Sequence, residues 1–210
     1  MTKPFDPAMA SFYPALIGCD EAGRGALCGP VVVAAVWFDP ASIPQALLGA
    51  LDDSKRLSAK KRDELAHEIV SAAQVSVAAS SARRIDGSNI RAMTLDAMKR
   101  AVLRLELREP VRIDGIDIPP GLDLPCEAVV KGDRKVPQIA AASIIAKTCR
   151  DRLMVKLAKR HPGYLWDKNS GYGTANHLTA LMQLGPTRHH RQTFEPISRH
   201  MTAHFVRIPG

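Results

Sequence analysis

The sequence predicts an α/β fold in a single domain, with helices packed on the faces of a sheet. Three observations lead to this prediction. Segments typical of strands and of amphipathic helices alternate along the first third of the chain, and two further strand-to-helix passages follow. The length of 210 residues suits one compact domain better than two. No repeat, low-complexity tract or long linker interrupts the chain.

The first half of the chain accounts for three strands and two helices. Residues 1–13 are expected to be frayed. Residues 15–20, 29–38 and 75–79 have strand-like patterns, and the second of these is so rich in valine that we expect it to be buried on both faces. The first helix is expected to begin at the N-cap Ser58. The second is expected from a cap at Asp86 to about Leu107, with Ile85 and Ile90 as a hydrophobic staple.

The second half contains two short strands and two helices. Residues 111–113 and 128–130 have β-like patterns, and each is followed by a combination of aspartate and glycine. Pro137 opens a long apolar helix over residues 139–157. Thr174 caps a further helix, which Gly185 and Pro186 stop.

The composition is that of a folded, basic protein. Hydrophobic residues make up 46% of the chain and charged residues 24%, which is typical of globular proteins and argues against disorder. Lysine and arginine number 29 against 21 aspartates and glutamates, so the formal net charge is +8. A basic folded surface attracts polyanions, and the charge therefore favours a nucleic-acid partner.

The sequence shows neither a membrane span nor a secretion signal. Its longest apolar stretch, residues 30–38, is far shorter than the ~18 residues that a spanning helix needs. The first 13 residues contain Lys3 and Asp6 rather than an apolar segment with a cleavage site. We therefore expect a cytoplasmic protein with reduced, mostly buried cysteines. The four cysteines are Cys19, Cys28, Cys126 and Cys149.

Acidic residues stand at or just past the ends of three predicted strands. Asp20 and Glu21 end the first strand, Asp114 ends the strand at 111–113, and Asp133 follows the strand at 128–130. Carboxylates that converge repel one another unless cations neutralise them, and Mg²⁺ or Mn²⁺ prefers such oxygen ligands. Two of these ions, about 3.5–4 Å apart, stabilise the attacking and leaving oxygens of an in-line phosphoryl displacement. The pattern is therefore compatible with a metal-dependent phosphodiesterase.

Simpler interpretations of the acids stay open at this point. Neighbours on a regular strand point to opposite faces, so Asp20 and Glu21 reach one ion only if the strand ends or bulges there, which Gly23 would allow. The pairs Asp114-Gly115 and Gly132-Asp133 are also common in ordinary turns.

Two glycine-flanked segments are candidates for contact with a sugar or a base. At Gly23, Arg24 and Gly25 the backbone can come close to a ligand and contact a 2′-hydroxyl, the group that distinguishes RNA from DNA. The alternative is a tight turn. Tyr172, between two glycines, can offer its ring for stacking, and the alternative is a tyrosine that fills the core.

Hydroxyl and cationic side chains at two places are candidates for binding backbone phosphates. They are Ser54, Lys55 and Arg56 in one segment, and Ser143, Lys147 and Arg150 on one helix face. Lys147 stands four residues before Asp151, so a surface ion pair is the alternative for it. The histidines at 189, 190, 200 and 204 lack ligand partners at zinc-like spacing, and we do not expect a zinc site.

Taken in order, these motifs closely resemble bacterial ribonuclease HII from about residue 18 to residue 196. The matching segments are Asp20-Glu21-Ala22-Gly23-Arg24-Gly25, Asp53-Ser54-Lys55-Arg56-Leu57, Asn89-Ile90, Ile113-Asp114-Gly115, Lys131-Gly132-Asp133, Ala141 to Lys147 with Arg150-Asp151, Gly171-Tyr172-Gly173-Thr174 and Gly185-Pro186-Thr187. Each motif alone is weakly specific, but the full set at compatible spacing is strongly specific.

The resemblance implies a ribonuclease H-like fold, with a mixed sheet flanked by helices and a helical C-terminal part over residues 174–210. It implies an endonuclease that uses Mg²⁺ or Mn²⁺, cuts RNA in RNA–DNA hybrids, and nicks DNA on the 5′ side of an embedded ribonucleotide. Asp20, Glu21, Asp114 and Asp133 match the metal-binding acids of the family. Gly23, Arg24 and Gly25 match the element that senses the 2′-hydroxyl, Tyr172 matches the ring that stacks on the next deoxyribose, and Asn89 is a further substrate-contact position.

From these motifs we expect a two-metal mechanism that leaves 3′-hydroxyl and 5′-phosphate ends, with the 2′-hydroxyl used for specificity. We expect a monomer that binds hybrids and ribonucleotide-containing duplexes. The short N-terminal segment and the Gly-Arg-Gly element favour ribonuclease HII over ribonuclease HIII. Two alternatives stay open. The chain could be a non-catalytic protein that binds nucleic acid through its basic surface alone, or a resolvase of the same fold.

Overall fold

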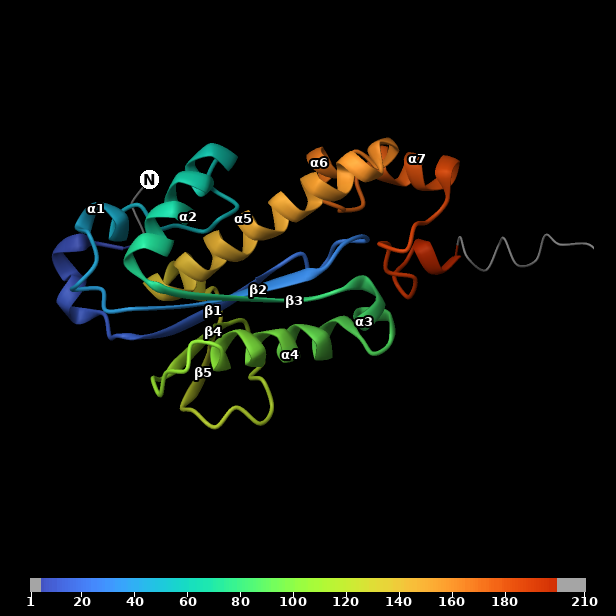
Figure 1. Cartoon of the computed structure of the whole chain (residues 1–210). Coiled ribbons are helices and arrows are strands. Elements are labelled where there is room, and N and C mark those ends of the chain that lie inside the picture. The colour runs from blue at the N-terminus through green and yellow to red at the C-terminus, as the bar shows by residue number, and fades with distance from the viewer. Residues whose placement is uncertain (1–4, 200–210) are drawn as a thin grey trace, which may run out of the picture. The chain divides into compact units, whose positions relative to one another are not determined.

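The computed structural model describes residues 5–199 (Figure 1). By their contacts, these residues form two compact units. The first unit contains, of the described residues, 5–22, 32–79 and 94–149. The second unit contains residues 23–31, residues 80–93 and, of the described residues, 150–199. The five-stranded sheet belongs essentially to the first unit, and short helices and turns make up most of the second.

The sheet has the order β3-β2-β1-β4-β5 and is mixed. β1 is antiparallel to β2 and parallel to β4, and β4 is parallel to β5. The fold class predicted from the sequence and from the family resemblance, an α/β fold with a mixed sheet between helices, is thereby confirmed. The strands are β1 (Leu16–Ala22), β2 (Val31–Phe38), β3 (Gln74–Ser80), β4 (Val111–Asp114) and β5 (Cys126–Val129).

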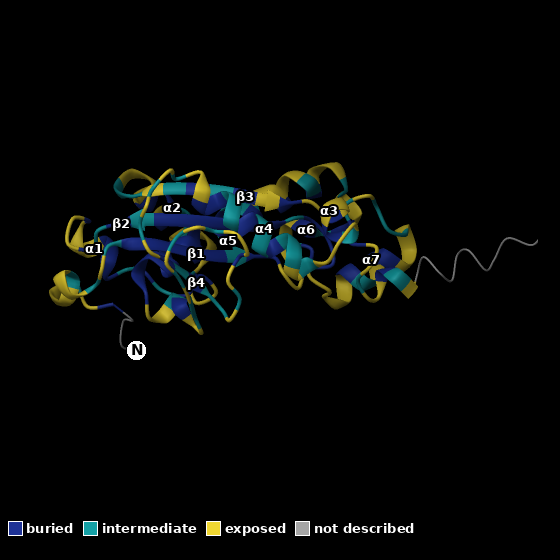
Figure 2. Cartoon of the chain, turned by 90° about the horizontal axis from the view of Figure 1, so that it is seen from below, coloured by how far each residue is buried: buried dark blue, intermediate teal, exposed yellow. Residues whose placement is uncertain are grey.

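Helices of the first unit cover both faces of the sheet (Figure 1). One face packs against α2 (Ala59–Ala72) and the first half of α5 (Pro137–Arg160), and the other packs against α4 (Ile90–Leu103). β1 and β2 are almost wholly buried between these layers (Figure 2), as the valine-rich sequence of β2 predicts. The unit also contains α1 (Gln45–Leu48) and the 3₁₀ helices η1 (Pro7–Phe12) and η2 (Gly132–Arg134).

Gly18 shows how closely α5 packs on β1. A Cβ atom built at Gly18 would lie 2.1 Å from the backbone carbon of Gln138 and 2.3 Å from the backbone nitrogen of Ile139. Only glycine therefore fits where the start of α5 crosses the strand. This contact fixes the helix against the strand that contains Asp20.

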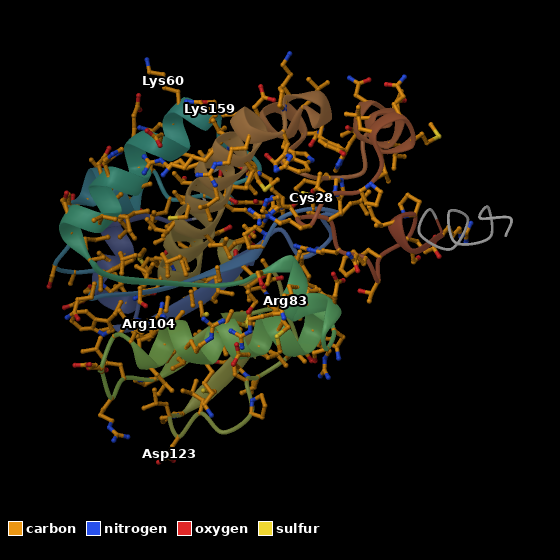
Figure 3. All side chains as sticks on the ribbon, turned by 45° about the vertical axis from the view of Figure 1, so that its right-hand side comes forward. Cys28, Lys60, Arg83, Arg104, Asp123 and Lys159 are labelled. Carbon is orange, nitrogen blue, oxygen red and sulfur yellow. The ribbon has the colours of Figure 1, made fainter. Side chains whose placement is uncertain are left out.

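The second unit has its own small core. It contains α3 (Ala82–Asp86), the last part of α5, η3 (Pro162–Tyr164), α6 (Trp166–Asn169) and α7 (Ala175–Leu184). The buried side chains of Met154, Trp166 and Ala180 pack together with Cys28, which is labelled in Figure 3.

Most helix boundaries follow the sequence signals. The Ser58 hydroxyl accepts from the Lys61 amide at the start of α2, and the Thr174 hydroxyl accepts from the His177 amide at the start of α7. These two predicted N-caps are confirmed. The helix predicted over residues 139–157 extends slightly further in both directions, as α5.

The predicted helix from Asp86 to Leu107 is wrong at both ends. Ser81 caps the short helix α3, which ends at Asp86, and a second helix, α4, runs only from Ile90 to Leu103. The Asn89 side chain accepts from the Ala92 amide at 2.8 Å and so caps α4. Asp86 accepts instead from the amides of Gln192 and Thr193, more than 100 residues later in the chain. Local sequence signals do not reveal such a partner.

Of the start expected to be frayed, residues 1–4 lie outside the described residues. In the rest of that segment, the Asp6 carboxylate caps η1, and Phe5 is buried in the core. The helical C-terminal part is present as α7, but an irregular segment follows it before residues 197–199 turn helical again. Residues 200–210, with His200 and His204, lie outside the described residues.

The four cysteines are free thiols, as expected, and Cys19 and Cys28 are buried. Cys126 and Cys149 are only partly buried, so the expectation of mostly buried thiols holds for half of them. Within residues 5–199, no helix is both long enough and apolar enough to cross a membrane.

Candidate active site

Two of the four predicted acids meet on adjacent parallel strands. Cys19 of β1 pairs with Ile113 of β4, so the next residues, Asp20 and Asp114, stand at matching positions. Cys19 and Ile113 lie in the core beneath α4. Because side chains alternate along a strand, Asp20 and Asp114 point to the other face, toward α5.

Asp20 is strongly perturbed by this position. The residue is only 6% exposed, and burial raises the pKa of its carboxyl well above the ordinary value. The charges of Glu21 and Asp114 raise that pKa further, whereas hydrogen bonds from the Ser143 side chain and the Glu21 amide lower it. The Glu21 amide donates to Asp20 Oδ1 at 2.6 Å. The strand end thus concentrates negative charge in a nearly dry position.

Asp133 joins this group through the turn after β5. The Gly132 amide donates to Asp114 Oδ1 at 2.7 Å, which ties the turn to the end of β4. Burial raises the pKa of Asp133, and the charges of Asp53 and Asp114 raise it further. We call Asp20, Asp114 and Asp133 the carboxylate set. These three acids, from distant parts of the sequence, are electrostatically coupled in one region of the first unit.

Glu21 occupies a different position from the other acids. β1 stays in regular register with β2 through Ala22, which pairs with Val32. The bulge that would turn Asp20 and Glu21 the same way is absent from this strand, and alternation directs Glu21 toward the α4 face. The strand ends one residue later, where Gly23 has a φ of +91°. Glu21 therefore lies beside the carboxylate set at the strand end but projects from the opposite face.

The chemistry of the carboxylate set fits a hard divalent cation. Burial and mutual repulsion disfavour the charged carboxylates, and a bound cation would remove both penalties. As the side chains stand within residues 5–199, no three aspartate, glutamate, histidine or cysteine side chains converge closely enough to enclose an ion. The donor types fit, but the closed coordination shell is not formed in this arrangement.

Asp53 is an acid of this region that the sequence prediction left out. Asp53 is buried, and its Oδ2 lies 3.5 Å from Nη2 of Arg134, the residue after Asp133. Its Oδ1 accepts from the Lys55 amide at 2.9 Å. The signal that could have revealed it is its place directly before Ser54 in the matched motif.

The predicted phosphate-binding residues fall into two groups. The hydroxyls of Ser54 and Ser143 lie 3.0 Å apart and are buried, so the fold brings these two segments together beside Asp20. Lys55 is close enough to Asp133 to lower the pKa of its carboxyl. Lys147 lies one helical turn after Ser143 on α5. Arg56, in contrast, pairs with Asp52 at 3.1 Å.

The Gly-Arg-Gly loop (residues 23–25) lies in the second unit, and its two glycines have different environments. A Cβ at Gly23 would lie 1.8 Å from Nε of Arg150, so the packing of the chain itself requires glycine there. A Cβ at Gly25 would meet nothing within 4 Å, and the φ of Gly25 lies outside the left-handed region. Gly25 and Arg24 are exposed. The fold therefore explains the first glycine but not the second.

Tyr172 is not the tyrosine that fills the core. It is 37% exposed, and the Arg150 guanidinium lies 5.3 Å from its ring centroid. The buried tyrosine of this unit is Tyr164, whose ring stacks on Trp166. Tyr172 thus presents a ring at the surface, as the stacking interpretation requires. Asn89, predicted to contact substrate, is exposed and caps α4.

The buried histidines form a hydrogen-bonded group. The Trp166 indole donates to His177 Nε2 at 3.0 Å, and His190 Nε2 lies 3.2 Å from the same atom. The Thr187 amide donates to His190 Nδ1 at 2.9 Å. With Nδ1 of His190 accepting, its Nε2 carries the proton and shares the single lone pair of His177 Nε2 with the Trp166 indole. Both rings are satisfied in their neutral form, and burial lowers the pKa of each.

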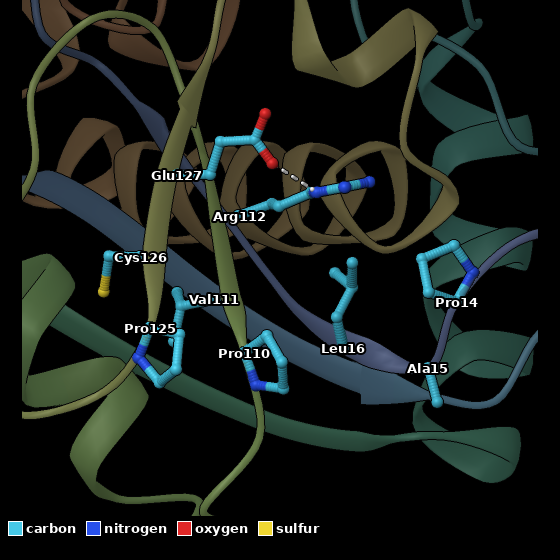
Figure 4. Close-up of a pocket in the computed structure, with 9 residues that line it drawn as sticks. All are labelled: Pro14, Ala15, Leu16, Pro110, Val111, Arg112, Pro125, Cys126 and Glu127. Atoms are coloured by element: carbon cyan, nitrogen blue, oxygen red, sulfur yellow. Dashed lines mark hydrogen bonds and ion pairs between the residues drawn. The ribbon is translucent and has the colours of Figure 1, made fainter.

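A pocket of about 270 Å³ lies at the other end of the parallel strands (Figure 4). Leu16, Val111 and Cys126, the first residues of β1, β4 and β5, contribute to its lining. Arg112 and Glu127 form a 2.8 Å ion pair at its wall. Ligands of open α/β sheets bind at the carboxyl ends of the strands, so this pocket is not the site of the carboxylate set.

Comparison with known proteins shows the family of the chain. The model of the ribonuclease HII family matches residues 17–197. The chain belongs to the ribonuclease HII family. Ribonuclease HII of Rhizobium etli (strain CIAT 652) is 50% identical over 191 residues, which cover 90% of this chain and 81% of that protein. Ribonuclease HII of Roseobacter denitrificans is 50% identical over 181 residues, covering 86% of this chain and 89% of that protein.

Solved structures agree with this assignment. The crystal structure of ribonuclease H2 from Pyrococcus horikoshii OT3 has a TM-score of 0.77 at 25% identity and covers 93% of this chain and all of that chain. The RNase HII chain in a complex with PCNA from Archaeoglobus fulgidus has a TM-score of 0.73 at 29% identity, covering 87% of this chain and 96% of that chain. A structure of Bst-RNase HIII with Mn²⁺ shares the fold at 22% identity, with a TM-score of 0.75, covering 96% of this chain and 74% of that chain.

Family membership settles the reaction class. Ribonuclease HII proteins are metal-dependent hydrolases of the type 2 ribonuclease H class, and they act on the RNA of RNA–DNA hybrids. The prediction of an endoribonuclease is confirmed at this level, and a purely non-catalytic binding protein and a resolvase are both rejected.

Proposed function

We propose that this chain nicks duplex DNA on the 5′ side of an embedded ribonucleotide and cleaves RNA–DNA hybrids by two-metal-ion catalysis. The products are 3′-hydroxyl and 5′-phosphate ends. The observation that carries the proposal is the buried Asp20 beside Asp114 at the ends of two parallel strands. This is the oxygen-rich, electronegative environment that divalent ions need for phosphoryl transfer.

In this proposal the carboxylate set and Glu21 hold the ions. When bound, two ions supply an activated water and stabilise the charge on the leaving oxygen. Glu21, at the end of β1 beside Asp20, would contribute a further carboxylate to such a site. The paired hydroxyls of Ser54 and Ser143, together with Lys55, Arg56 and Lys147, bind backbone phosphates and position the substrate without reading its sequence.

The second unit supplies recognition of the ribonucleotide. A Cβ at Gly25 would meet no protein atom within 4 Å. This open space supports a close approach of the Gly25 backbone to a 2′-hydroxyl, because a side chain there would meet the sugar and not the protein. Arg24 flanks this approach, and Tyr172 stacks on the following deoxyribose. Asn89, which is exposed on the same unit, also contacts the substrate in this proposal. A single catalytic domain, a monomer and a cytoplasmic location remain our predictions from the sequence.

The test is a cleavage assay on four labelled substrates, each with Mg²⁺ or Mn²⁺ and with chelator. The substrates are a duplex with one ribonucleotide, its all-DNA counterpart, an RNA–DNA hybrid and a four-way junction. We expect metal-dependent cleavage of the first and third only, with a 5′-phosphate on the downstream fragment. Asp20→Asn should reduce turnover roughly 100-fold or more. Asp123→Asn, on an exposed loop, is the matched control (Figure 3), and equal turnover in the two variants contradicts the proposal.

Gly25→Ala tests the recognition step separately. The added methyl meets no protein atom, so the free energy of unfolding should stay within about 0.5 kcal/mol of the wild type. Cleavage at the single ribonucleotide should decrease at least tenfold, because the methyl blocks the approach of the sugar. Gly87→Ala, another exposed glycine with ordinary φ, is the control. A Gly25→Ala enzyme with wild-type cleavage would show that the loop is only a turn.

A further inference from the structure

Two arginines in the second unit are completely buried. Arg150 and Arg191 are each 0% exposed. A buried guanidinium is unfavourable unless its donors are satisfied, and its planar group presents five N–H donors in a fixed geometry. The donors of both side chains reach backbone carbonyls around the Gly-Arg-Gly loop. Burial also lowers the pKa of both groups.

Arg191 binds both ends of the loop segment. Its Nη2 donates to the Gly23 carbonyl at 2.7 Å, and its Nη1 donates to the Arg24 carbonyl at 2.8 Å. Its Nε and Nη2 also donate to the Gly29 carbonyl, at 3.2 and 3.1 Å. The Arg191 amide donates to the Leu27 carbonyl at 2.9 Å. One residue, more than 160 positions away in sequence, therefore fixes four carbonyls of residues 23–29.

Arg150 connects the same segment to Tyr172. Its Nε donates to the Pro30 carbonyl at 3.0 Å and its Nη2 to the Cys28 carbonyl at 3.1 Å. Its Nη1 donates to the Ser170 carbonyl at 2.9 Å, two residues before Tyr172. The guanidinium carbon lies over the Tyr172 ring, 5.3 Å from its centroid, and a Cβ atom built at Gly23 would lie 1.8 Å from Nε. The arginine is thus in contact with both proposed recognition elements at once.

We propose that Arg150 and Arg191 are positioning residues that hold the Gly-Arg-Gly loop and Tyr172 in one preformed arrangement for ribonucleotide recognition. They are buried and act through the backbone carbonyls and the tyrosine ring. The prediction that Arg150 binds a backbone phosphate is therefore wrong, because its donors are directed at protein carbonyls. A preformed loop does not have to be ordered when the substrate binds, so binding energy is kept for discrimination. This inference rests on the proposed function of the loop and of Tyr172.

The geometry requires arginine rather than a generic positive charge. Each side chain donates to three carbonyls that lie in different directions, which suits the fork of a guanidinium. A lysine ammonium is a compact charge, and it lacks the planar guanidinium group that lies near the Tyr172 ring. Lysine variants therefore keep the charge and most of the side-chain volume but lose the simultaneous contacts.

The experiment compares Arg191→Lys and Arg150→Lys with Tyr164→Phe. The control removes a hydrogen bond from the Tyr164 hydroxyl to the Gly185 carbonyl in the same unit, and this hydroxyl donates to no carbonyl of residues 23–29. We measure kcat and KM on the single-ribonucleotide duplex and on the RNA–DNA hybrid, and amide hydrogen exchange at residues 23–29 and 171–173. Both lysine variants should lower the single-ribonucleotide to hybrid ratio of kcat/KM about tenfold and speed exchange in both segments. Tyr164→Phe should leave the ratio unchanged, whatever its melting temperature.

The outcomes separate the inference from the proposed function. If the lysine variants lower both activities equally, the arginines have only a structural role and the inference is wrong. Should one variant fail to fold, the other decides, because each contacts the loop independently. A wild-type enzyme that does not cleave the single-ribonucleotide duplex disproves the proposed function, and the inference with it. A wild-type enzyme that does cleave it, with unchanged exchange in both variants, disproves the inference alone.

Discussion

Glycine has three different meanings in this chain. Gly18 gives room to the backbone of α5, and Gly23 gives room to the Arg150 side chain. Gly25 gives room to nothing within the described protein. In the sequence all three look like flexible positions, and only the structure separates packing from an open approach. A glycine without an internal reason is therefore the better indicator of a ligand.

The charged form of Asp20 should make the protein less stable than a variant with a neutral side chain at this position. A carboxyl whose pKa is raised in the folded state favours its protonated form, so its contribution to stability is lost as the pH rises through that raised pKa. At neutral pH in chelator, Asp20→Asn should therefore raise the melting temperature by a few degrees, although it removes activity. The asparagine oxygen can still accept from the Glu21 amide.

The effect of divalent ions on the melting temperature tests the same account. Mg²⁺ or Mn²⁺ should raise the melting temperature of the wild type and have a smaller effect on Asp20→Asn, because binding to the folded state stabilises it. Asp123→Asn should respond as the wild type does. A melting temperature of Asp20→Asn below that of the wild type in chelator would contradict the electrostatic account.

Among the helices, local caps were predictable and distant partners were not. Ser58 and Thr174 stand directly before amphipathic segments, and their capping bonds are local. Asp86 has the same local signal, but its carboxylate binds amides at 192 and 193, so the cap passes to Asn89. A helix start is therefore mispredicted where the side chain with the local capping signal binds a distant segment instead.

Asn89 has a structural role that its substitution must separate from substrate binding. Asn89→Ala removes the cap of α4 and should cost about 1 kcal/mol of stability. Asn89→Asp keeps an acceptor for the Ala92 amide and should unfold at the wild-type denaturant concentration. The new negative charge should raise KM for the nucleic acid severalfold if the side chain contacts a phosphate. Identical KM values for Asn89→Asp and wild type would restrict Asn89 to the cap.

Across the molecule, the order of motifs predicted the α/β sheet and three acids that the structure brings into one region, because strand ends and their acids are local in sequence. Asp20, Asp114 and Asp133 needed only the parallel pairing of β1, β4 and β5 to come together. The opposite face of Glu21 depends on register, which patterns of residues do not fix. The carbonyl partners of Arg191, like the division of the chain into two units, depend on contacts between distant segments.

The pH dependence of stability should show two opposing contributions. Burial lowers the pKa of His177, and burial with the charge of His177 lowers the pKa of His190 from 6.5 to about 4. A histidine with a depressed pKa contributes stability above pH ~6.5 that is lost as the pH falls toward 4. Asp20 and Asp133 act in the opposite direction, since acid protonates carboxyls that burial disfavours in charged form.

Thermal melting between pH 4 and pH 8 measures the histidine contribution. The melting temperature should decrease below pH ~6.5, because the unfolded state then binds a proton that folded His190 can accept only by losing its bond from the Thr187 amide. His190→Gln should flatten this decrease, and His67→Gln, at an exposed position on α2, should leave it intact. If His190→Gln and the wild type have parallel curves, the buried histidines do not control acid stability.

The unbroken pairing of β1 also restricts how the chain can vary in length. Deleting one residue upstream of Asp20 within Leu16–Ala22 would slide the strand by a single position and exchange the faces of a core thiol and a carboxylate. Charge would then enter the apolar layer under α4, while the opposite face would lose its acid. The loop between β4 and β5 has no such constraint, since its residues belong to neither ladder. Insertions and deletions among related chains should accordingly gather in that loop and avoid the first strand.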